Sequence, residues 1–348
     1  MKRIVVIGGL ATLLLAAIAA LWLSRYYEEQ HSALNAPLPI STQTLFTVKS
    51  GTNLKQLAHE FAERQWLSEP QFFYWYVRHK KLPTDIKAGT FALDPHMSVL
   101  DAVALFVEGR EAQNSFAIIE GWNFRQLRAA LEASPHLEQT LAGLDDAQVM
   151  AQLGRDDRHP EGMFLADTYL FPPGTTDLET LQRAHAALER RLAIIWEGRE
   201  EGLPLKDSYE ALTLASIIEK ETAAPQERAL IAGVFVARMR KKMLLQTDPT
   251  VIYGLGAAFD GNLRRRDLRA DTPYNTYTRK GLPPTPIAIV GESALLAAVH
   301  PEIDGSIYFV SRGDGTHQFS RTYAEHLRAV RKYQLRKRRR KKTGQGAS

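Results

Sequence analysis

The sequence predicts a helix-rich α+β protein that follows a single N-terminal transmembrane helix. Three observations support this: an uncharged apolar run near the start, a strand-helix-helix-strand pattern after it, and long helical patterns with few short strands further on. With 348 residues and 45% apolar content, the chain is long enough for one or two packed domains. It has no cysteine, which excludes disulfides, thiol nucleophiles and thiolate metal sites.

The positive charge of the chain is concentrated near its C-terminal end. The net charge is +5, but residues 331–342 hold nine Lys or Arg and no acid, so the remainder carries −4. A nucleic-acid footprint along the whole chain is therefore not supported. We expect residues 336–348 to form a basic, disordered tail.

Residues 4–24 form an uncharged run of the length that crosses a bilayer as a helix. Basic residues precede the run and acidic residues follow it, so the positive-inside bias places residues 1–3 in the cytoplasm and the rest outside. A cleaved signal peptide is the alternative, but the run is long and its end is bulky. We expect a single-pass protein of the cytoplasmic (inner) membrane, with residues 25–43 as a polar linker.

Residues 44–112 predict a small βααβ module. Alternating residues at 45–49 predict a strand, and a turn then leads to apolar residues at helical spacing. An aromatic stretch at 72–77 predicts the second helix, and residues 86–93 predict a turn and the second strand. A further helix is expected over 99–107.

The two ends of this module resemble a LysM module. The matching residues are 46–52 at the start and 86–91 at the end. LysM modules bind glycans that contain N-acetylglucosamine. The interval between the two pieces is longer here than in a plain module. Both a glycan-binding module and a module used only for packing therefore stay open.

Residues 113–335 predict a helix-rich α+β domain. Its clearest helical patterns cover about 177–197, 208–224 and 227–242. The other expected elements are helical patterns up to about 152, a strand and turn at 118–122, a stiff loop at 169–175, and short strands at 308–310 and 318–319.

The helix expected over 208–224 has well-defined ends. Asp207 is a suitable N-cap, and Glu210 three residues later completes a capping-box pattern. Pro225 bars continuation of the helix, so it should end near residue 224.

This helix places one acidic residue among apolar ones. At 100° per residue, Leu214, Ile217 and Ile218 form one apolar stripe, and Glu221 falls within it. Glu219 points to the opposite side. The helical spacing therefore selects Glu221 as the glutamate that faces the core.

A carboxyl on a core-facing stripe is costly to ionise, so its pKa should rise and it should donate a proton near neutral pH. Such a group can serve as the general acid in glycosidic cleavage, where the leaving oxygen must be protonated. A buried glutamate that pairs with an arginine is the alternative reading. Periodicity alone leaves both open.

Three polar and aromatic segments follow this helix, at 246–250, 271–277 and 281–284. They combine amide, hydroxyl and carboxylate groups with tyrosines and prolines. Such loops suit sugar recognition, because rings stack on tyrosine while polar groups contact hydroxyls. Each segment alone is also compatible with ordinary loop chemistry.

Several strings occur together in one order: ASIIEKET at 215–222, LQTDPTVIYG at 245–254, YNTY at 274–277, GLPP at 281–284 and YFV at 308–310. In this order they resemble the endolytic murein transglycosylase (YceG-like) family, and the resemblance covers nearly the whole chain. It implies an endolytic lyase of peptidoglycan. The catalytic glutamate of the family is the second of its E-K-E motif, which falls on Glu221.

The resemblance implies that one carboxyl acts twice. Glu221 would protonate the oxygen between N-acetylmuramic acid and N-acetylglucosamine, and then take the proton of the muramic 6-hydroxyl as that oxygen attacks the anomeric carbon. The product is a 1,6-anhydro end, whereas ordinary glycosidases use a pair of carboxyls. No metal or cofactor is expected. The candidates for orienting the sugar or stabilising the oxocarbenium-like state are Gln246, Asp248, Tyr253, Asn275 and Tyr277.

The resemblance also implies partners. Family members act on nascent glycan strands near the inner membrane and limit strand length alongside the peptidoglycan synthases (penicillin-binding proteins). The LysM-like module would set the height of the cut above the membrane. The basic tail departs from the family pattern, and outside the cell it would meet anionic lipid headgroups or peptidoglycan carboxylates. Nucleic acid is not an expected partner.

Two other functions stay open. One is a hydrolase that uses Asp248 as a second carboxylate beside Glu221, which would leave reducing ends. The other is a non-catalytic, peptidoglycan-binding scaffold of the synthesis machinery, which would work without the carboxyl of Glu221.

Overall fold

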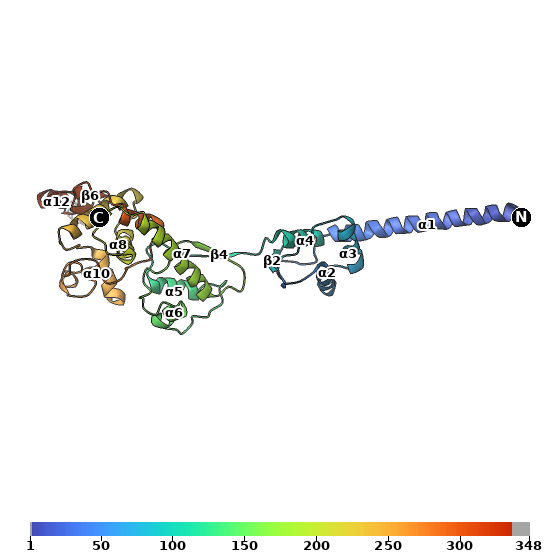
Figure 1. Ribbon diagram of the computed structural model, residues 1–348, viewed down its shortest axis with the longest axis horizontal. Coiled ribbons are helices and arrows are strands. Elements are labelled where there is room, and N and C mark those ends of the chain that lie inside the picture. Colours follow the sequence, from blue (N-terminus) through green and yellow to red (C-terminus); the bar gives the residue numbers. More distant parts are fainter. Residues whose placement is uncertain (1, 336–348) are drawn as a thin grey trace, which may run out of the picture. The chain divides into compact units, whose positions relative to one another are not determined.

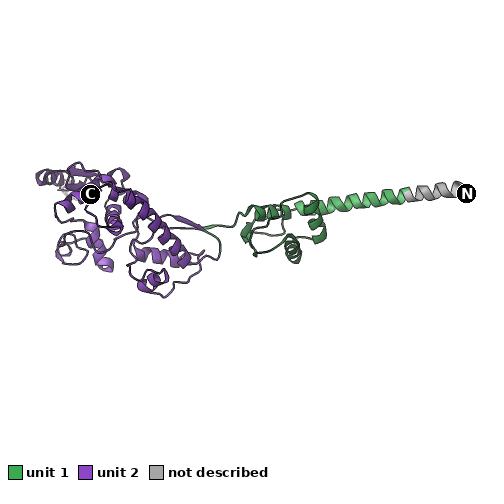
Figure 2. Cartoon of the chain, in the orientation of Figure 1, with its two compact units in different colours: residues 1–114, 171–173 green, residues 115–170, 174–348 purple. Residues whose placement is uncertain are grey.

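The computed structural model describes residues 2–335, with side chains from residue 13 to residue 334. The chain divides into two compact units (Figure 2). The first holds residues up to 114 together with 171–173, and the second holds residues 115–170 and those from 174 onward. The basic tail expected at 336–348 lies outside the described residues.

The first unit begins with the long helix α1 (Lys2–Asn35), labelled in Figure 1. This helix includes the uncharged run 4–24, whose first part lies outside the residues with described side chains. Within the residues that the structure describes, no helix has the length and apolar character needed to cross a membrane.

Helix α1 continues into the segment 25–43, which was expected to be a linker. Leu34 near the end of the helix and Leu38 just after it are buried in the core of the first unit. His31 on the same helix lies 3.1 Å from the hydroxyl of Tyr76 through its Nε2 atom. The end of α1 is therefore part of a packed unit and not a free tether.

The rest of the first unit has the predicted strand-helix-helix-strand order, followed by the predicted fourth helix. The strands β1 and β2 pair antiparallel, and this places Phe46 opposite Phe91. Both phenylalanines pack on Phe106, with ring centroids 5.3 and 4.8 Å from it. The elements are β1 (Thr44–Val48), α2 (Leu54–Glu63), α3 (Pro70–His79), β2 (Gly89–Leu93) and α4 (Val99–Glu108).

The second unit is helix-rich with two small sheets, as predicted. The strands β3 and β4 pair with each other, and β5 and β6 form an antiparallel hairpin. Its helices and strands are β3 (Asn114–Ala117), α5 (Phe124–Glu132), α6 (Asp146–Gln152), β4 (Thr168–Phe171), α7 (Asp177–Glu197), α8 (Ser208–Glu221), α9 (Arg228–Arg240), α10 (Asp248–Leu255), α11 (Glu292–Val299), β5 (Tyr308–Ser311), β6 (His317–Ser320) and α12 (Tyr323–Val330). Short 3₁₀ turns lie at Pro225–Glu227, Gly256–Ala258 and Asp267–Arg269, and a short π-helix at Arg331–Leu335.

Two predicted boundaries in this unit were wrong. The strand expected at 118–122 forms earlier, as β3, and the loop expected at 169–175 begins as the strand β4. These two segments pair with each other. A pairing between segments some fifty residues apart leaves no local pattern in the sequence, which explains both errors.

Helix α8 is the centre of the second unit. The helices α7, α9, α10 and α11 all contact it, and every residue from Ala211 to Ile218 is buried. The buried set includes the polar Thr213 and Ser216, whose hydroxyls donate to backbone carbonyls of the same helix. The apolar stripe predicted for this helix is thus part of an all-round buried surface.

The ends of α8 differ from the prediction in two details. Asp207 is the N-cap and accepts the N–H of Glu210, but the Glu210 carboxylate accepts the N–H of Lys206, so the capping box is incomplete. At the other end the helix stops at Glu221 instead of near residue 224. Thr222 is already extended, with φ −144° and ψ 135°, and its hydroxyl accepts the N–H of Ala224.

Gly233 marks the tightest approach of backbone to a helix in this unit. It lies inside α9, where the carbonyl of Glu302 occupies the space that a Cβ atom would need. The backbone N–H of Glu302 also donates to the carbonyl of Ala229 at 2.9 Å. Close contact between α9 and the segment after α11 therefore depends on glycine.

We predict that Gly233→Ala destabilises the protein, because the added methyl must displace backbone. The expected loss is about 1–3 kcal/mol, although alanine stabilises an open helical position by about 1 kcal/mol. Thermal unfolding of the two proteins measures the change. Gly198→Ala is the matched control, since a Cβ there would lie 3.7 Å from its nearest neighbour. Equal effects of the two changes would contradict this packing.

Candidate active site

Glu221 is the last residue of α8, and its carboxyl is held at the end of a buried helix. The Thr247 hydroxyl donates a hydrogen bond to its Oε1 atom. Thr247 is itself the N-cap residue of α10, yet its side chain makes no capping bond. The Thr247 hydroxyl, which would ordinarily cap α10, therefore bonds the Glu221 carboxyl at the end of α8.

The surroundings of Glu221 favour its protonated form. Burial raises the pKa, and the negative charge of Asp248 raises it further. The hydrogen bond from Thr247 and the positive charges of His317 and Arg238 lower it, and the balance lies at about 7. Near neutral pH the carboxyl is therefore present in both forms, as a group that first donates and then accepts a proton requires.

Glu219 on the same helix differs from Glu221 in its partners. Its carboxylate forms an ion pair with Arg228 at 2.9 Å, with side chains 5% and 9% exposed, and it accepts the N–H of Gly291 at 3.2 Å. Burial raises its pKa, while Gly291 and Arg228 lower it. The helical wheel placed Glu219 on the other side of α8 correctly, but that side is buried too. Glu219 is the arginine-paired glutamate, whereas Glu221 has no such ion pair within the part of the chain that the structure describes.

Three of the predicted site residues lie near Glu221. Asp248 begins α10 directly after Thr247, and its Oδ1 atom accepts the hydroxyl of Tyr277 at 2.5 Å. Burial raises the pKa of Tyr277, and the charges of Asp248 and Glu221 raise it further. Gln246 precedes Thr247 with φ 53°, and its N–H donates to the carbonyl of Thr276 at 3.1 Å.

Arg238 on α9 organises this region, and the sequence prediction missed it. Its guanidinium donates to the carbonyls of Leu245 at 2.8 Å and of Ile307 at 2.7 Å. A longer contact of 3.4 Å reaches Oε1 of Gln246. Burial lowers the pKa of Arg238, and Glu221 is one of the groups that oppose this shift. Arg238 thus holds the backbone that leads to Thr247 and adds positive charge near the Glu221 carboxyl.

Tyr253 faces a second buried carboxyl. Burial raises the pKa of Tyr253, and the charge of the Glu161 carboxyl raises it further. Its ring packs against Tyr274 with centroids 4.9 Å apart. Glu161 is 3% exposed and accepts the N–H of Phe124, the first residue of α5, at 3.1 and 3.2 Å. Burial raises the pKa of Glu161 to about 7. The sequence prediction missed this carboxyl because no helical pattern surrounds it.

Asn275 has no polar group left for a sugar. It is 1% exposed, its amide donates to the carbonyls of Asp267 and Ala270, and its carbonyl accepts the N–H of Tyr277. These bonds tie the loop before it to the backbone of Tyr277. The structure therefore gives Asn275 a part in holding the loop in place.

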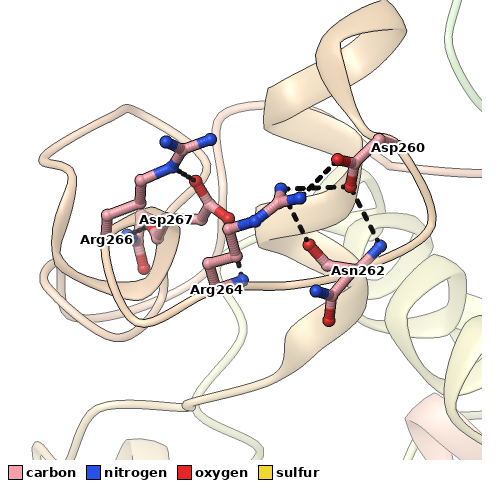
Figure 3. A network of polar contacts seen from close by, with 6 residues as sticks. Asp260, Asn262, Arg264, Arg266 and Asp267 are labelled. Atoms are coloured by element: carbon pink, nitrogen blue, oxygen red, sulfur yellow. Dashed lines mark hydrogen bonds and ion pairs between the residues drawn. The ribbon is translucent and has the colours of Figure 1, made fainter.

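The loop after α10 is braced by its own charges, as Figure 3 shows. Arg264 pairs with Asp260, whose Oδ1 atom also accepts the N–H of Asn262 at 3.2 Å. The backbone N–H of Arg264 donates to Asp267, which lies 3.5 Å from the guanidinium of Arg266. This network and the bonds of Asn275 connect parts of the segment between Asp248 and Tyr277 to one another.

No metal-binding cluster stands out in the part of the chain that the structure describes. Within residues 2–335, no three His, Asp or Glu side chains are grouped so that they could hold a metal ion.

Residues 46–332 match the YceG-like family. The chain belongs to this family. It is similar to a protein of Bacillus subtilis (strain 168) named endolytic murein transglycosylase, with 32% identity over 311 residues, 84% of this chain and 85% of that protein. A Streptococcus pneumoniae (strain R6) protein of the same name is 25% identical over 336 residues, but this chain spans only 60% of its length.

A solved structure of the YceG-like family is also similar. The 2.6 Å crystal structure of a putative YceG-like protein from Listeria monocytogenes aligns with a TM-score of 0.53 and 28% sequence identity. The alignment covers 83% of this chain and 99% of that one. The chain therefore has a YceG-like fold.

We predict that Glu221→Gln makes the stability of this YceG-like protein less sensitive to alkaline pH. The folded-state pKa of about 7 lies above the ordinary value of 4.5, so protonation of Glu221 contributes stability below pH 4.5. That contribution is lost as pH rises through 7, by at most about 3 kcal/mol. Glutamine stays neutral at every pH. The free energy of unfolding of the variant should therefore rise relative to that of the wild type above pH 7 and not near pH 4.5.

Thermal unfolding between pH 4.5 and 8.5 measures this difference. Glu219→Gln is the matched control, because it breaks a buried ion pair and should destabilise the protein at neutral pH. Unfolding curves of Glu221→Gln and the wild type that keep a constant separation over this range would contradict the raised pKa.

Proposed function

We propose that this YceG-like protein is an endolytic lytic transglycosylase that cleaves peptidoglycan strands between N-acetylmuramic acid and N-acetylglucosamine. The observation that carries the proposal is Glu221, a half-buried residue whose carboxyl is desolvated, has a pKa of about 7 and, among the described residues, forms no ion pair. The names of the similar Bacillus and Streptococcus proteins support the choice of substrate.

The reaction would use one carboxyl for two proton transfers. Glu221 gives its proton to the glycosidic oxygen, the bond from that oxygen to the anomeric carbon breaks, and the bonding electron pair stays on the leaving oxygen. The Glu221 carboxylate then takes the proton of the muramic 6-hydroxyl as O6 attacks the anomeric carbon. A 1,6-anhydro end forms, Glu221 is protonated again, and no water is consumed.

Asp248 suits an electrostatic part in this reaction. It lies close enough to raise the pKa of Glu221, and the Tyr277 hydroxyl holds its Oδ1 atom at 2.5 Å. A carboxylate fixed in this way can stabilise the positive charge that develops on the sugar ring. Gln246 and Tyr277 are exposed or half-buried beside it and can contact the sugar.

We further propose that residues 4–24 anchor the chain in the cytoplasmic membrane, with the catalytic unit on the periplasmic or outer side. The uncharged run and its flanking charges support this. The βααβ order of the first unit supports a LysM-like module that contacts glycan strands. Peptidoglycan synthases that make these strands are the proposed partners.

The packed end of α1 bears on how the anchor would act. Because Leu34 and Leu38 are buried in the first unit, the helix leads directly from the uncharged run into the module. The height of the module above the membrane would then be set by a helix. Inserting residues into the segment 25–43 would disturb the packing of the module as well as change its distance from the membrane.

We predict that two charges within the run release the chain from membranes. Leu14→Arg together with Ile18→Arg adds about 2.5–3.5 kcal/mol per arginine to the free energy of insertion at the centre of a membrane helix. The wild type should stay in the membrane fraction after an alkaline carbonate wash, and the double variant should not. Leu14→Ala with Ile18→Ala is the control. A wild-type protein that the wash removes would contradict the anchor.

We predict that Glu221→Gln lowers the rate of cleavage of uncross-linked glycan strands by a factor of about 10² to 10⁴, because glutamine cannot donate the proton. Mass spectrometry should show that the wild-type products are lighter by one water than hydrolysis products. Glu302→Gln in the same unit should leave the rate unchanged. Reducing ends would instead indicate a hydrolase.

A scaffold function gives a different outcome. In that case the membrane-bound full chain would not cleave strands, and Glu221→Gln would restore cell-wall phenotypes of a deletion strain as well as the wild type does.

A further inference from the structure

The two carboxyl oxygens of Glu221 lie in different surroundings. Oε1 accepts the hydroxyl of Thr247, whereas Oε2 has no hydrogen-bond partner among the described residues. In that part of the chain, the fully buried side-chain polar atoms without a partner are Nε of Arg228 and Nδ1 of His326. Oε2 is not one of them, so it reaches accessible space. The carboxyl is therefore held at one oxygen and open at the other.

The direction of the Thr247 bond decides where the proton of Glu221 lies. A threonine hydroxyl has one proton, and Thr247, which is 2% exposed, donates it to Oε1. If Oε1 carried the acid proton, the Thr247 hydroxyl would lose its acceptor, which is costly for a buried donor. The acid proton of Glu221 is therefore placed on Oε2, the open oxygen.

Two further buried threonines hold Thr247 in place. Thr250 and Thr276 are 0% and 2% exposed, and their hydroxyl oxygens lie 2.9 Å apart. The Thr250 hydroxyl donates to the carbonyl of Thr247 at 2.8 Å. The N–H of Thr247 in turn donates to the hydroxyl oxygen of Thr276 at 3.1 Å. The three residues thus form a closed set of hydrogen bonds in which each bond supports the others.

These threonines also align the two segments that carry candidate sugar-binding residues. Asp248 follows Thr247 and Tyr277 follows Thr276 in the sequence, and the Tyr277 hydroxyl donates to Oδ1 of Asp248 at 2.5 Å. A threonine at an N-cap ordinarily accepts an N–H of its own helix, but Thr247 makes no such bond to α10. Its hydroxyl is used for Glu221 instead.

We infer that Thr247 is a positioning residue for Glu221: its hydroxyl occupies Oε1 and leaves Oε2 as the oxygen that gives and takes the proton. This inference rests on the proposed transglycosylase reaction and adds to it the identity of the reacting oxygen. The Oε2–H bond breaks as the glycosidic oxygen takes the proton. It forms again with the proton of the muramic 6-hydroxyl, and Thr247 keeps its own proton in both steps.

The first test observes the carboxyl in the full-length protein in detergent, without substrate. At a pH below 7, the infrared difference between the wild type and Glu221→Gln isolates the C=O stretching band of protonated Glu221. If Oε1 is the carbonyl oxygen, its hydrogen bond lowers the frequency of this band. Thr247→Val keeps the shape of the side chain but removes the donor, so the band should move to higher wavenumber. An unmoved band would overturn the inference.

The second test follows the reaction on uncross-linked glycan strands. Thr247→Val should lower kcat by about 10- to 100-fold, because the Glu221 carboxyl is no longer held in line, and should leave KM nearly unchanged. The carboxylate also loses a hydrogen bond, so the fall of kcat/KM at alkaline pH should move up by about one pH unit. Thr247→Ser keeps the hydroxyl and should restore both values. A serine variant no better than the valine variant would contradict the role of the hydroxyl.

Thr213→Val is the matched control. Thr213 is 2% exposed on α8, and its hydroxyl donates to the carbonyl of Tyr209 at 2.8 Å. The same chemical change is thus made in the helix of Glu221 without removing the bond to Oε1. It should move neither the infrared band nor kcat, and shifts equal to those of Thr247→Val would overturn the inference.

Thr247→Ala decides the matter if Thr247→Val does not fold, which near-UV circular dichroism shows. It removes the same donor and adds no atoms, so the band should again move to higher wavenumber. An unmoved band in folded Thr247→Ala would overturn the inference. Because the infrared test uses no substrate, it is distinct from a failure of the wild type to cleave glycan, which would contradict the proposed function.

Discussion

The whole site depends on desolvating a carboxyl that has no ion pair among the described residues. Desolvation of Glu221 at the end of α8 is the largest cause of its raised pKa, and one hydroxyl, that of Thr247, is its hydrogen-bond partner. Much of the second unit can be understood as support for this arrangement. The central helix fixes the position of the carboxyl, and the neighbouring helices supply charges of both signs that hold its pKa near neutral.

The neighbouring Glu219 shows what an ordinary solution to the same burial looks like. It lies two residues earlier on the same helix, has an arginine and a backbone N–H, and ties α8 to α9 and to the start of α11. A paired carboxylate of this kind holds elements together but exchanges its proton poorly. Glu219 therefore contributes to stability, whereas Glu221 is the carboxyl suited to proton transfer. This difference in partners distinguishes the two residues more clearly than their positions in the helix do.

Much of the fold could be predicted from local patterns. The helix Asp177–Glu197 has the predicted bounds, and the βααβ order follows from alternation and helical spacing. Glu221 was identified from its spacing to Ile217 and Ile218. The reasoning assumed one apolar stripe, however, whereas α8 is buried all round. Thr222 and Pro225 end the helix next to Glu221, and Thr247 reaches its carboxyl from another segment. The catalytic role of Glu221 stays a prediction.

The charges that tune Glu221 were beyond such reasoning. Arg238 and His317 lie on separate elements, and the bonds of His317 to Glu227 join residues 90 positions apart in the chain. Nothing in the local sequence around either residue predicts this meeting. Asn275 shows the reverse error: its amide looked suited to a sugar, but the fold uses all of it to hold a loop.

The most direct test of the central claim is to cleave glycan strands with the full chain in water enriched in oxygen-18. If the Glu221 carboxylate takes the proton of the muramic 6-hydroxyl while the oxygen of that hydroxyl attacks the anomeric carbon, the new ends contain no oxygen-18. One oxygen-18 atom at the anomeric carbon of each new reducing end would mean that water is the nucleophile, and would contradict a lyase that works through a single carboxyl.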